Sequence, residues 1–302
     1  MTTRLRHLTR LLDLERAELA ALIERADALR QGAEPRRFPD KILGLVFEKP
    51  STRTRISFEA AAFRLGAGSV FMTQRDSQLQ RGEPVRDTAR VLGRYLDALA
   101  LRTFAQETIE ESARYAGVPV INALSDRYHP CQTIADLLTL QQHLGRFEGL
   151  RLVYLGDGNN VFASLAEAAA LVDIDLVFCG PEGYDPDPDL VAEVRELGGR
   201  VTTIRDPEQA VAGADVLYTD VWTSMGQEEE SERRRRDLAS YQINRDLLSV
   251  AGDALVLHCL PAHRGEEITD DVIEGAQSRV FDQAENRMWA QMAVLEAIWS
   301  RE

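Results

Sequence analysis

The chain has 302 residues, of which 44% are apolar, and a formal net charge of −14; this length is enough for two domains with large cores. So acidic a protein is not expected to bind nucleic acid or an anionic membrane through its general field, and an anionic ligand would need a local cluster of arginines. Its three cysteines, an odd number, do not form a disulfide framework. The N-terminus lacks the apolar core of a signal peptide, and no apolar run is long enough for a membrane span. Together these features predict a cytoplasmic protein.

Segments with the pattern of strands alternate with segments of helical period, as parallel sheets built from βαβ units require. In the first half the candidate strands are residues 42–47, 69–72, 98–101 and 118–121. A long helix is expected over residues 131–144. In the second half the candidate strands are residues 152–155, 176–179, 201–204, 216–219 and 255–258.

The predicted fold class is therefore α/β, with two domains that each hold a central parallel sheet flanked by helices. The loop-like run from Gly145 to Gly149 separates the two series of strands. We place the domain boundary there, so that the first domain covers residues 1–144 and the second covers residues 145–284.

The run from Pro50 to Arg55 reads Pro-Ser-Thr-Arg-Thr-Arg and lies between a candidate strand and a helix. The first N–H groups of a helix lack partners, and the helix dipole adds partial positive charge there. Ser51 and Thr52 can cap the helix or donate hydrogen bonds, while Arg53 and Arg55 contribute fixed charge and bidentate donors. An ordinary capped helix with solvated arginines is the alternative to this phosphate-binding interpretation.

A second polar sequence, His129-Pro130-Cys131-Gln132, lies at the start of the long helix. Pro130 restricts the backbone, so that His129 and Gln132 can point toward one ligand. An imidazole, neutral or charged, and an amide suit a polarised carbonyl and the nitrogen beside it. Alone the sequence is more often structural, but together with the arginine run it indicates a carbonyl next to a phosphate.

Four consecutive arginines, residues 233–236, resemble a nucleic-acid-binding patch at first sight. Glu229, Glu230 and Glu232 precede three of them by four residues. This spacing favours helical ion pairs on a solvated face instead. The turn Gly156-Asp157-Gly158-Asn159-Asn160 has no G-x-G-x-x-G pattern, which argues against a nicotinamide site.

In this combination the sequence resembles the aspartate/ornithine carbamoyltransferase family, from about Leu8 to Ile298. The resemblance implies transfer of the carbamoyl group of carbamoyl phosphate to an amine, by a homotrimer with active sites between subunits. It makes residues 1–144 the carbamoyl phosphate-binding domain, with the C-terminal helix at 285–302 packing back on it, and residues 145–284 the amino-acid-binding domain, the two joined by interdomain helices. The mechanism suggested by these parts needs no metal or organic cofactor.

The resemblance assigns carbamoyl phosphate binding to residues from both halves of the chain. These are Ser51, Thr52, Arg53, Thr54, Gln78, Arg102, His129, Gln132, Cys259, Leu260 and Arg287. Gln78 would reach into the site of a neighbouring subunit, and Arg55 would support the helix start. The expected catalytic residues are Arg102, His129 and Cys259.

For the amine, the resemblance assigns Asn160, Asp220, Ser224 and Met225. Asp220 offers a carboxylate to an α-ammonium group, whereas an aspartate substrate would prefer a cation there. The version His258-Cys259-Leu260-Pro261 accompanies ornithine in the family, and aspartate enzymes carry His-Pro-Leu-Pro. The expected reaction is therefore carbamoylation of the δ-amine of L-ornithine, giving L-citrulline and phosphate.

Two alternatives remain open from the sequence. One is a carbamoyltransferase for another amine, such as putrescine or an acylated ornithine. The other is a non-catalytic ligand-binding paralogue on the same fold. The acceptor of the amine proton is also open between Cys259 and the leaving phosphate.

Overall fold

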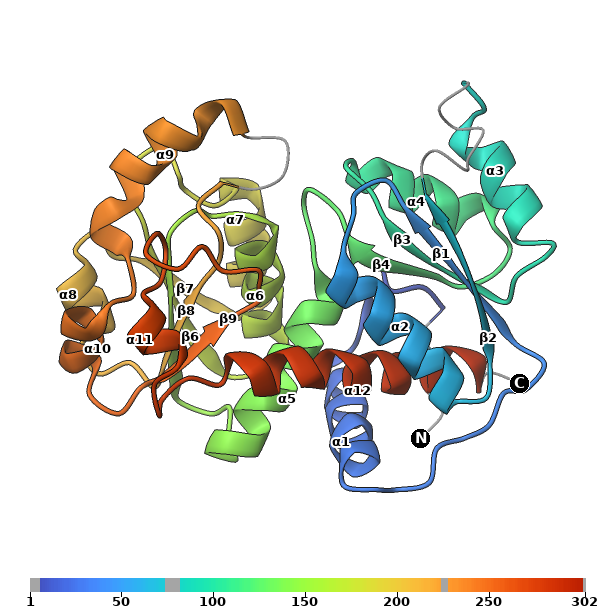
Figure 1. Cartoon of the computed structure of the whole chain (residues 1–302), viewed down its shortest axis with the longest axis horizontal. Coiled ribbons are helices and arrows are strands. Elements are labelled where there is room, and N and C mark those ends of the chain that lie inside the picture. The colour runs from blue at the N-terminus through green and yellow to red at the C-terminus, as the bar shows by residue number, and fades with distance from the viewer. Residues whose placement is uncertain (1–5, 74–81, 224–227, 301–302) are drawn as a thin grey trace. The chain divides into compact units, whose positions relative to one another are not determined.

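A computed structural model describes residues 6–73, 82–223 and 228–300. The chain divides into two compact units, one of residues Met1–Leu138 with Glu285–Glu302 and one of residues Thr139–Ala284. Both boundaries fall inside helices, the first within α5 (Pro130–Leu144) and the second within α12 (Val280–Trp299). Each unit has a central sheet flanked by helices, so the predicted α/β class is confirmed (Figure 1).

The first unit contains a four-stranded parallel sheet in the order β2-β1-β3-β4. Its strands are β1 (Ile42–Phe47), β2 (Gly68–Thr73), β3 (Ala98–Arg102) and β4 (Val120–Leu124). Its complete helices are α1 (Arg16–Arg30), α2 (Thr52–Arg64), α3 (Val85–Leu92) and α4 (Gln106–Tyr115), with a short 3-10 turn at Leu11–Asp13. Almost all of β1 and all of β3 are buried, as expected for strands covered on both faces.

Two helices close one face of this sheet with a compact apolar core. Ala89 of α3 and Ile109 of α4 pack with Val46, Leu99 and Leu101 of the strands. Figure 1 shows α3 and α4 together over these strands. Burial of such side chains contributes about 1.5–3 kcal/mol each, and this rigid support determines where the strand ends lie.

The second unit contains a five-stranded parallel sheet in the order β7-β6-β5-β8-β9. Its strands are β5 (Leu150–Leu155), β6 (Ile174–Cys179), β7 (Arg200–Thr203), β8 (Val216–Thr219) and β9 (Leu255–His258). Its complete helices are α6 (Asn160–Leu171), α7 (Pro188–Glu196), α8 (Pro207–Val211), α9 (Ser231–Leu238), α10 (Arg245–Ala251) and α11 (Asp270–Ile273), with 3-10 turns at Glu228–Glu230 and Ala239–Tyr241.

Different side chains fill the two faces of the second sheet. On one face Tyr154, Phe178 and Tyr218 of the strands form an aromatic cluster with Phe162 of α6, in which ring centroids lie 5.2–5.5 Å apart. The other face packs against α8, α10 and α11 through aliphatic residues. Because successive residues of a strand point to opposite faces, one apolar strand can serve both cores.

In both sheets, strands are added first on one side of the first strand and then on its other side. In the first sheet the chain runs from β1 to β2 and then crosses to β3 on the other side of β1. In the second sheet it runs from β5 through β6 to β7 and then crosses to β8 on the other side of β5. Ligand groups in open parallel sheets gather at the carboxyl ends of the strands at such a switch point. There Phe47 lies beside Arg102, and Thr219 lies between Leu155 and His258.

The predicted strands agree closely with the observed ones, with one informative shift. The sequence indicated a strand over 118–121, but β4 begins at Val120. Pro119 has no N–H to give to the ladder, although its carbonyl still accepts a hydrogen bond from Leu99. The last helix also begins earlier than the predicted Glu285, at Val280.

The prediction that residues 233–236 form a wholly solvated face is wrong for Arg234. Its side chain is buried, and it pairs with Asp157 as well as with Glu230, four residues earlier, at 3.7 Å. Arg233 also pairs with Glu230, at 2.9 Å, instead of the expected Glu229. Arg234 and Leu238 lie four residues apart and are both buried, so one stripe of α9 faces inward.

No helix in the described ranges combines the length and the apolar character that a membrane span requires.

Candidate active site

The predicted phosphate-binding run forms a capped helix start in the first unit. Ser51 has an extended backbone, and its Oγ accepts a hydrogen bond from the backbone N–H of Thr54 at 3.3 Å. The Ser51 hydroxyl donates to Oγ1 of Thr54 at 2.9 Å, and Nη2 of Arg287 donates to the same oxygen at 2.5 Å. The Thr54 oxygen therefore accepts two hydrogen bonds, which leaves its own proton to be donated to a ligand.

The two arginines of this run lie in different surroundings. Arg55 pairs with Glu59 one turn along α2, at 3.1 Å, and its guanidinium lies 3.7 Å from the ring centroid of Phe71. Nε of Arg53 is buried and has no hydrogen-bond partner among the described residues. A buried donor without a partner costs about 1–3 kcal/mol, so Arg53 is the arginine whose surroundings favour an anionic ligand.

Arg102, His129 and Arg287 are buried side chains of the same unit. Burial is the main reason that the pKa of His129 lies well below 6.5, and the positive charges of Arg287 and Arg102 lower it further. The imidazole is therefore neutral at pH 7, which decides between the two charge states left open by the sequence. A neutral imidazole can donate one hydrogen bond to a carbonyl without adding repulsion to the arginines.

We expect the stability of the protein to depend on pH through His129. Because the pKa of the folded-state imidazole lies well below 6.5, the unfolded chain takes up a proton first as the pH falls. The free energy of unfolding should then decrease below pH 6.5, by up to about 1.4 kcal/mol per pH unit. Urea unfolding of the wild type and His129→Gln at several pH values measures this effect. Parallel pH dependences of the two proteins would contradict it.

Gln132 has its amide oriented by a carboxylate. Its Nε2 donates to Oδ1 of Asp136, one helical turn along α5, at 2.8 Å. A carboxylate only accepts hydrogen bonds, so the NH₂ end of the amide must face it. Oε1 of Gln132 is buried without a hydrogen-bond partner among the described residues. This oxygen is suited to accept a hydrogen bond from the NH₂ of a carbamoyl group.

Lys49 is a basic residue of this region that the sequence analysis missed. It is buried directly before Pro50, and its Nζ lies 4.0 Å from the ring centroid of Phe104. Burial lowers the pKa of the ammonium from 10.5, and the charge of Arg102 lowers it further. Its position next to the arginine run was the only available signal, since lysine before a turn is usually solvated.

In the second unit, Asp220 and Cys259 meet at the ends of β8 and β9. Sγ of Cys259 donates to Oδ1 of Asp220 at 2.9 Å, and the backbone N–H of Val221 donates to the same oxygen at 2.8 Å. Oδ2 of Asp220 accepts a hydrogen bond from Nδ2 of Asn159, also at 2.8 Å. Two residues that are 39 positions apart in the chain therefore form one thiol–carboxylate pair.

Asn159, which the sequence analysis passed over for Asn160, connects this pair to α6. Its Oδ1 caps α6 by accepting from the N–H groups of Val161 and Phe162, at 3.0 and 3.2 Å. The Tyr154 hydroxyl donates to the same oxygen at 2.9 Å. Asn160 is the partly buried first residue of α6. Asparagine before an apolar helix is a capping signal that could have identified Asn159.

His258 holds the backbone of the segment that follows β9. Its Nδ1 accepts a hydrogen bond from the N–H of Leu260 at 2.9 Å, so Nε2 carries the proton and donates to Glu267 at 3.1 Å. Leu260 has φ 59, a conformation that costs a leucine energy, and its peptide bond to Pro261 is cis. The hydrogen bonds of His258 to Glu267 and from Leu260 therefore restrain the residues on both sides of Cys259.

Models of two protein-family domains match this chain over nearly its whole length. Residues 6–142 match the aspartate/ornithine carbamoyltransferase carbamoyl-P binding domain, and residues 148–298 match the Asp/Orn binding domain. The chain belongs to this family. The match covers both units, including every predicted site residue.

Individual relatives in the family agree with this result. An ornithine carbamoyltransferase of Gloeobacter violaceus is 54% identical over 95% of this chain and 93% of its own length. One from Archaeoglobus fulgidus is 49% identical over 99% of both chains. The solved structure of ornithine carbamoyltransferase from Pyrococcus furiosus is 44% identical, with a TM-score of 0.94 over 100% of both chains.

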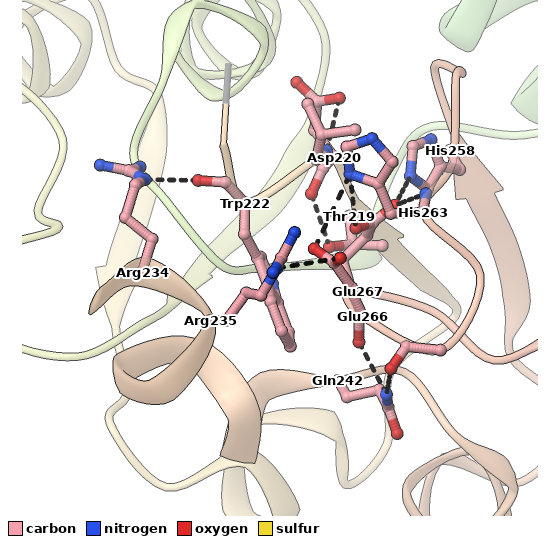
Figure 2. Close-up of polar contacts among 12 residues, drawn as sticks. Thr219, Asp220, Trp222, Arg234, Arg235, Gln242, His258, His263, Glu266 and Glu267 are labelled. Atoms are coloured by element: carbon pink, nitrogen blue, oxygen red, sulfur yellow. Dashed lines mark hydrogen bonds and ion pairs between the residues drawn. The ribbon is translucent and has the colours of Figure 1, made fainter. Parts of the chain in front are cut away.

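Among the described residues, two clusters have donor atoms spaced closely enough for a metal ion. Asp220, His258 and Cys259 form one, and His263, Glu266 and Glu267 form the other. Figure 2 shows that the second cluster is bound into a polar network. Since both ring nitrogens of His258 already take part in hydrogen bonds, a metal at the first cluster would have to break that network.

Three predicted family positions lie outside the described residues. They are Gln78, Ser224 and Met225.

Proposed function

We propose that the protein transfers the carbamoyl group of carbamoyl phosphate to the δ-amine of L-ornithine, giving L-citrulline and phosphate. The observation that carries this proposal is the thiol–carboxylate pair of Cys259 and Asp220. A carboxylate suits the α-ammonium of a diamino acid and disfavours an aspartate substrate. Relatives that are 49–54% identical to the chain bear the name ornithine carbamoyltransferase.

In the proposed mechanism, the first unit binds carbamoyl phosphate. The positive charges of Arg53, Arg102 and Arg287 neutralise the phosphate and stabilise it as a leaving group. Ser51 and Thr52 add hydrogen bonds at the start of α2. Gln78 of a neighbouring subunit completes this set.

The carbonyl end is bound by groups with defined hydrogen-bonding roles. Arg102, neutral His129 and the Thr54 hydroxyl donate toward the carbonyl oxygen, where negative charge develops as the amine attacks. Oε1 of Gln132 accepts from the carbamoyl NH₂, because Asp136 holds the other end of the amide.

The second unit binds ornithine in this mechanism. Asp220 pairs with the α-ammonium, Asn160 binds the amino-acid backbone, and Ser224 and Met225 add hydrogen bonds. Cys259 and Leu260 lie at the end of β9, where the thiol helps to position the δ-amine. A free amine with a pKa near 10.4 is neutral in only about one molecule in 2,500 at pH 7, a deficit of about 4.6 kcal/mol, so the site must lower this pKa.

The hydrogen bond of Cys259 limits how the thiol can act on that amine. The thiol donates its proton to Asp220, so it can accept the amine proton only by passing its own proton on. The departing phosphate is the competing acceptor. In either case the amine nitrogen forms a bond to the carbamoyl carbon, the bond from carbon to the phosphate oxygen breaks, and one proton leaves the nitrogen.

Cys259→Ser is expected to decrease kcat by about 10²-fold, the lower end of the range for groups that transfer protons. The serine hydroxyl can keep the hydrogen bond to Asp220, but it does not ionise in the range of a thiol. The dependence of kcat on pH should therefore shift. An unchanged pH profile would exclude the thiol from proton transfer and favour the phosphate.

The acceptor amine can be tested by citrulline formation from carbamoyl phosphate and ornithine, with parallel reactions of putrescine, N-acetylornithine and aspartate. Strong selectivity for ornithine is expected. Preference for putrescine or an acylated ornithine would overturn the assignment of Asp220. Binding of carbamoyl phosphate without turnover of any amine would favour a non-catalytic paralogue.

We also propose that the protein is a homotrimer that works in the cytoplasm in arginine metabolism, where the same site serves arginine biosynthesis or, in reverse, arginine breakdown. Large apolar side chains on α2 and on the edge strand β2 are exposed in the single chain, among them Ile56, Phe63 and Val70. The three cysteines are free thiols, which suits a reducing compartment. Light scattering should give three times the chain mass of 33.8 kDa. A monomer at micromolar concentration would contradict the trimer.

A further inference from the structure

Arg234 differs from its three neighbours in the arginine run. The side chains of Arg233, Arg235 and Arg236 are 57%, 54% and 77% exposed, whereas that of Arg234 is 6% exposed. Arginine is rarely buried unless its charge and its donors have partners. The contacts of Arg234 therefore indicate what the residue does.

The guanidinium of Arg234 contacts two loops that come from different strands. Nε donates to the backbone carbonyl of Trp222 at 2.5 Å, a contact drawn in Figure 2. Nη2 forms an ion pair with the carboxylate of Asp157. The guanidinium carbon also lies 4.9 Å from the ring centroid of Tyr184. A planar fork can reach acceptors in two directions, which the single ammonium of a lysine cannot reproduce.

The loop after β8 carries Asp220 of the proposed ornithine site, and the loop after β5 leads directly into Asn160 of that site. Asp157 precedes Asn159 by two residues in the loop after β5, and Trp222 follows Asp220 by two residues in the loop after β8. The same loops meet directly where Asn159 donates to Asp220 at 2.8 Å. Arg234 thus forms a second bridge between the two loops, in addition to the hydrogen bond from Asn159 to Asp220.

Arg234 also balances the negative charge of Asp157, a partly buried carboxylate close to Asp220. Burial raises the pKa of Asp157, and the charges of Asp220 and Glu230 raise it further. The ion pair and hydrogen bond with Arg234 oppose this rise. Without the arginine, two carboxylates would repel each other across the loops that must bind one α-ammonium group.

We propose that Arg234 is a positioning residue for the ornithine site, holding the loops after β5 and β8 so that Asn159 and Asp220 meet. This inference rests on the proposed function, because that function assigns Asp220, and Asn160 next to Asn159, to the amine substrate. It does not depend on which amine is used. Arg234 belongs to α9 and to neither loop, and it bridges them through its contacts with Asp157 and Trp222, while Glu230 and Tyr184 hold the guanidinium from other sides.

The test compares Arg234→Met and Arg234→Lys with Arg233→Met, a control on the exposed side of the same helix. Arg234→Met should raise the KM for ornithine about 10- to 100-fold, as expected when a binding group is displaced by a fraction of an ångström to 1 Å. The Kd for carbamoyl phosphate should stay within about twofold. Arg234→Lys should lie between Arg234→Met and the wild type, because it restores one of the two contacts. The control should behave as the wild type.

A second pair of variants separates positioning from loss of stability. Arg234→Met leaves Asp157 buried without its arginine, and adding Asp157→Asn removes that charge. The double variant should recover thermal stability but keep the raised KM for ornithine. Recovery of the wild-type KM together with stability would overturn the proposal, as would equal losses in the binding of both substrates by a folded Arg234→Met.

These results can be distinguished from a failure of the proposed function. If the wild type carbamoylates a different amine, the KM for that amine becomes the quantity that Arg234→Met should raise. If the wild type uses ornithine and Arg234→Met keeps its KM, the function stands and the positioning role is wrong.

Discussion

Replacing Arg53 with alanine is expected to weaken carbamoyl phosphate binding and to slow its reaction with ornithine, the latter by about 10²- to 10³-fold. The guanidinium has a fixed charge, so it acts on the phosphate in the ground state and on the leaving group in the transition state. Nε of Arg53 is buried and has no hydrogen-bond partner among the described residues. The substitution therefore breaks no other hydrogen bond of Nε, and the expected loss reflects the contact with phosphate.

Steady-state kinetics and direct binding of carbamoyl phosphate by calorimetry measure the two parts of this effect. Arg55→Ala is the matched control, because Arg55 lies on the same helix but pairs with Glu59. It should change kcat/KM little. A loss in Arg53→Ala that is confined to the KM for ornithine would contradict the role in phosphate binding.

Asp220→Asn is expected to affect the other substrate. The substitution keeps the shape of the side chain but removes the charge that would pair with the α-ammonium of ornithine. Loss of one partner from a buried charged pair costs about 2–5 kcal/mol, so kcat/KM for ornithine should fall by the corresponding factor. Carbamoyl phosphate binding should change little.

Initial rates at varied ornithine, with carbamoyl phosphate saturating, measure the effect of Asp220→Asn. Asp246→Asn, an exposed aspartate on α10, is a control for the loss of one negative charge from the protein. The Asn159 contact provides an internal check, since Asn159→Ala should produce a smaller change of the same kind. An unchanged KM for ornithine in Asp220→Asn would remove the carboxylate from substrate binding.

The sheets could be predicted from the sequence because buried parallel strands are continuous apolar runs. The strand β1 was located from Ile42 to Phe47, where the structure also has it. Ends of elements were harder to predict, because they depend on individual hydrogen bonds. The strand β4 starts only after Pro119, and α12 begins five residues before Glu285. The order of the strands was not predicted, since periodicity does not specify which strands pair.

Within the site, residues carried by a contiguous sequence motif could be proposed from the sequence, whereas those that act through a distant partner could not. Asn159 becomes significant only because its amide reaches Asp220, and Asp136 because it orients Gln132. The sequence places Arg234 on a solvated face, because a glutamate four positions earlier can pair with an arginine whether that arginine is buried or exposed. Only the packing of α9 distinguishes the two cases.

The proposed assignments make acceptor choice a modular property, because the two sheets have separate switch points. The groups proposed for ornithine follow β5, β8 and β9, and the groups proposed for carbamoyl phosphate belong to the other unit, apart from Cys259 and Leu260. Exchange of short segments after three strands could therefore redirect carbamoylation to a new amine, for example one without an α-ammonium group. The chemistry of the carbamoyl donor would be inherited unchanged.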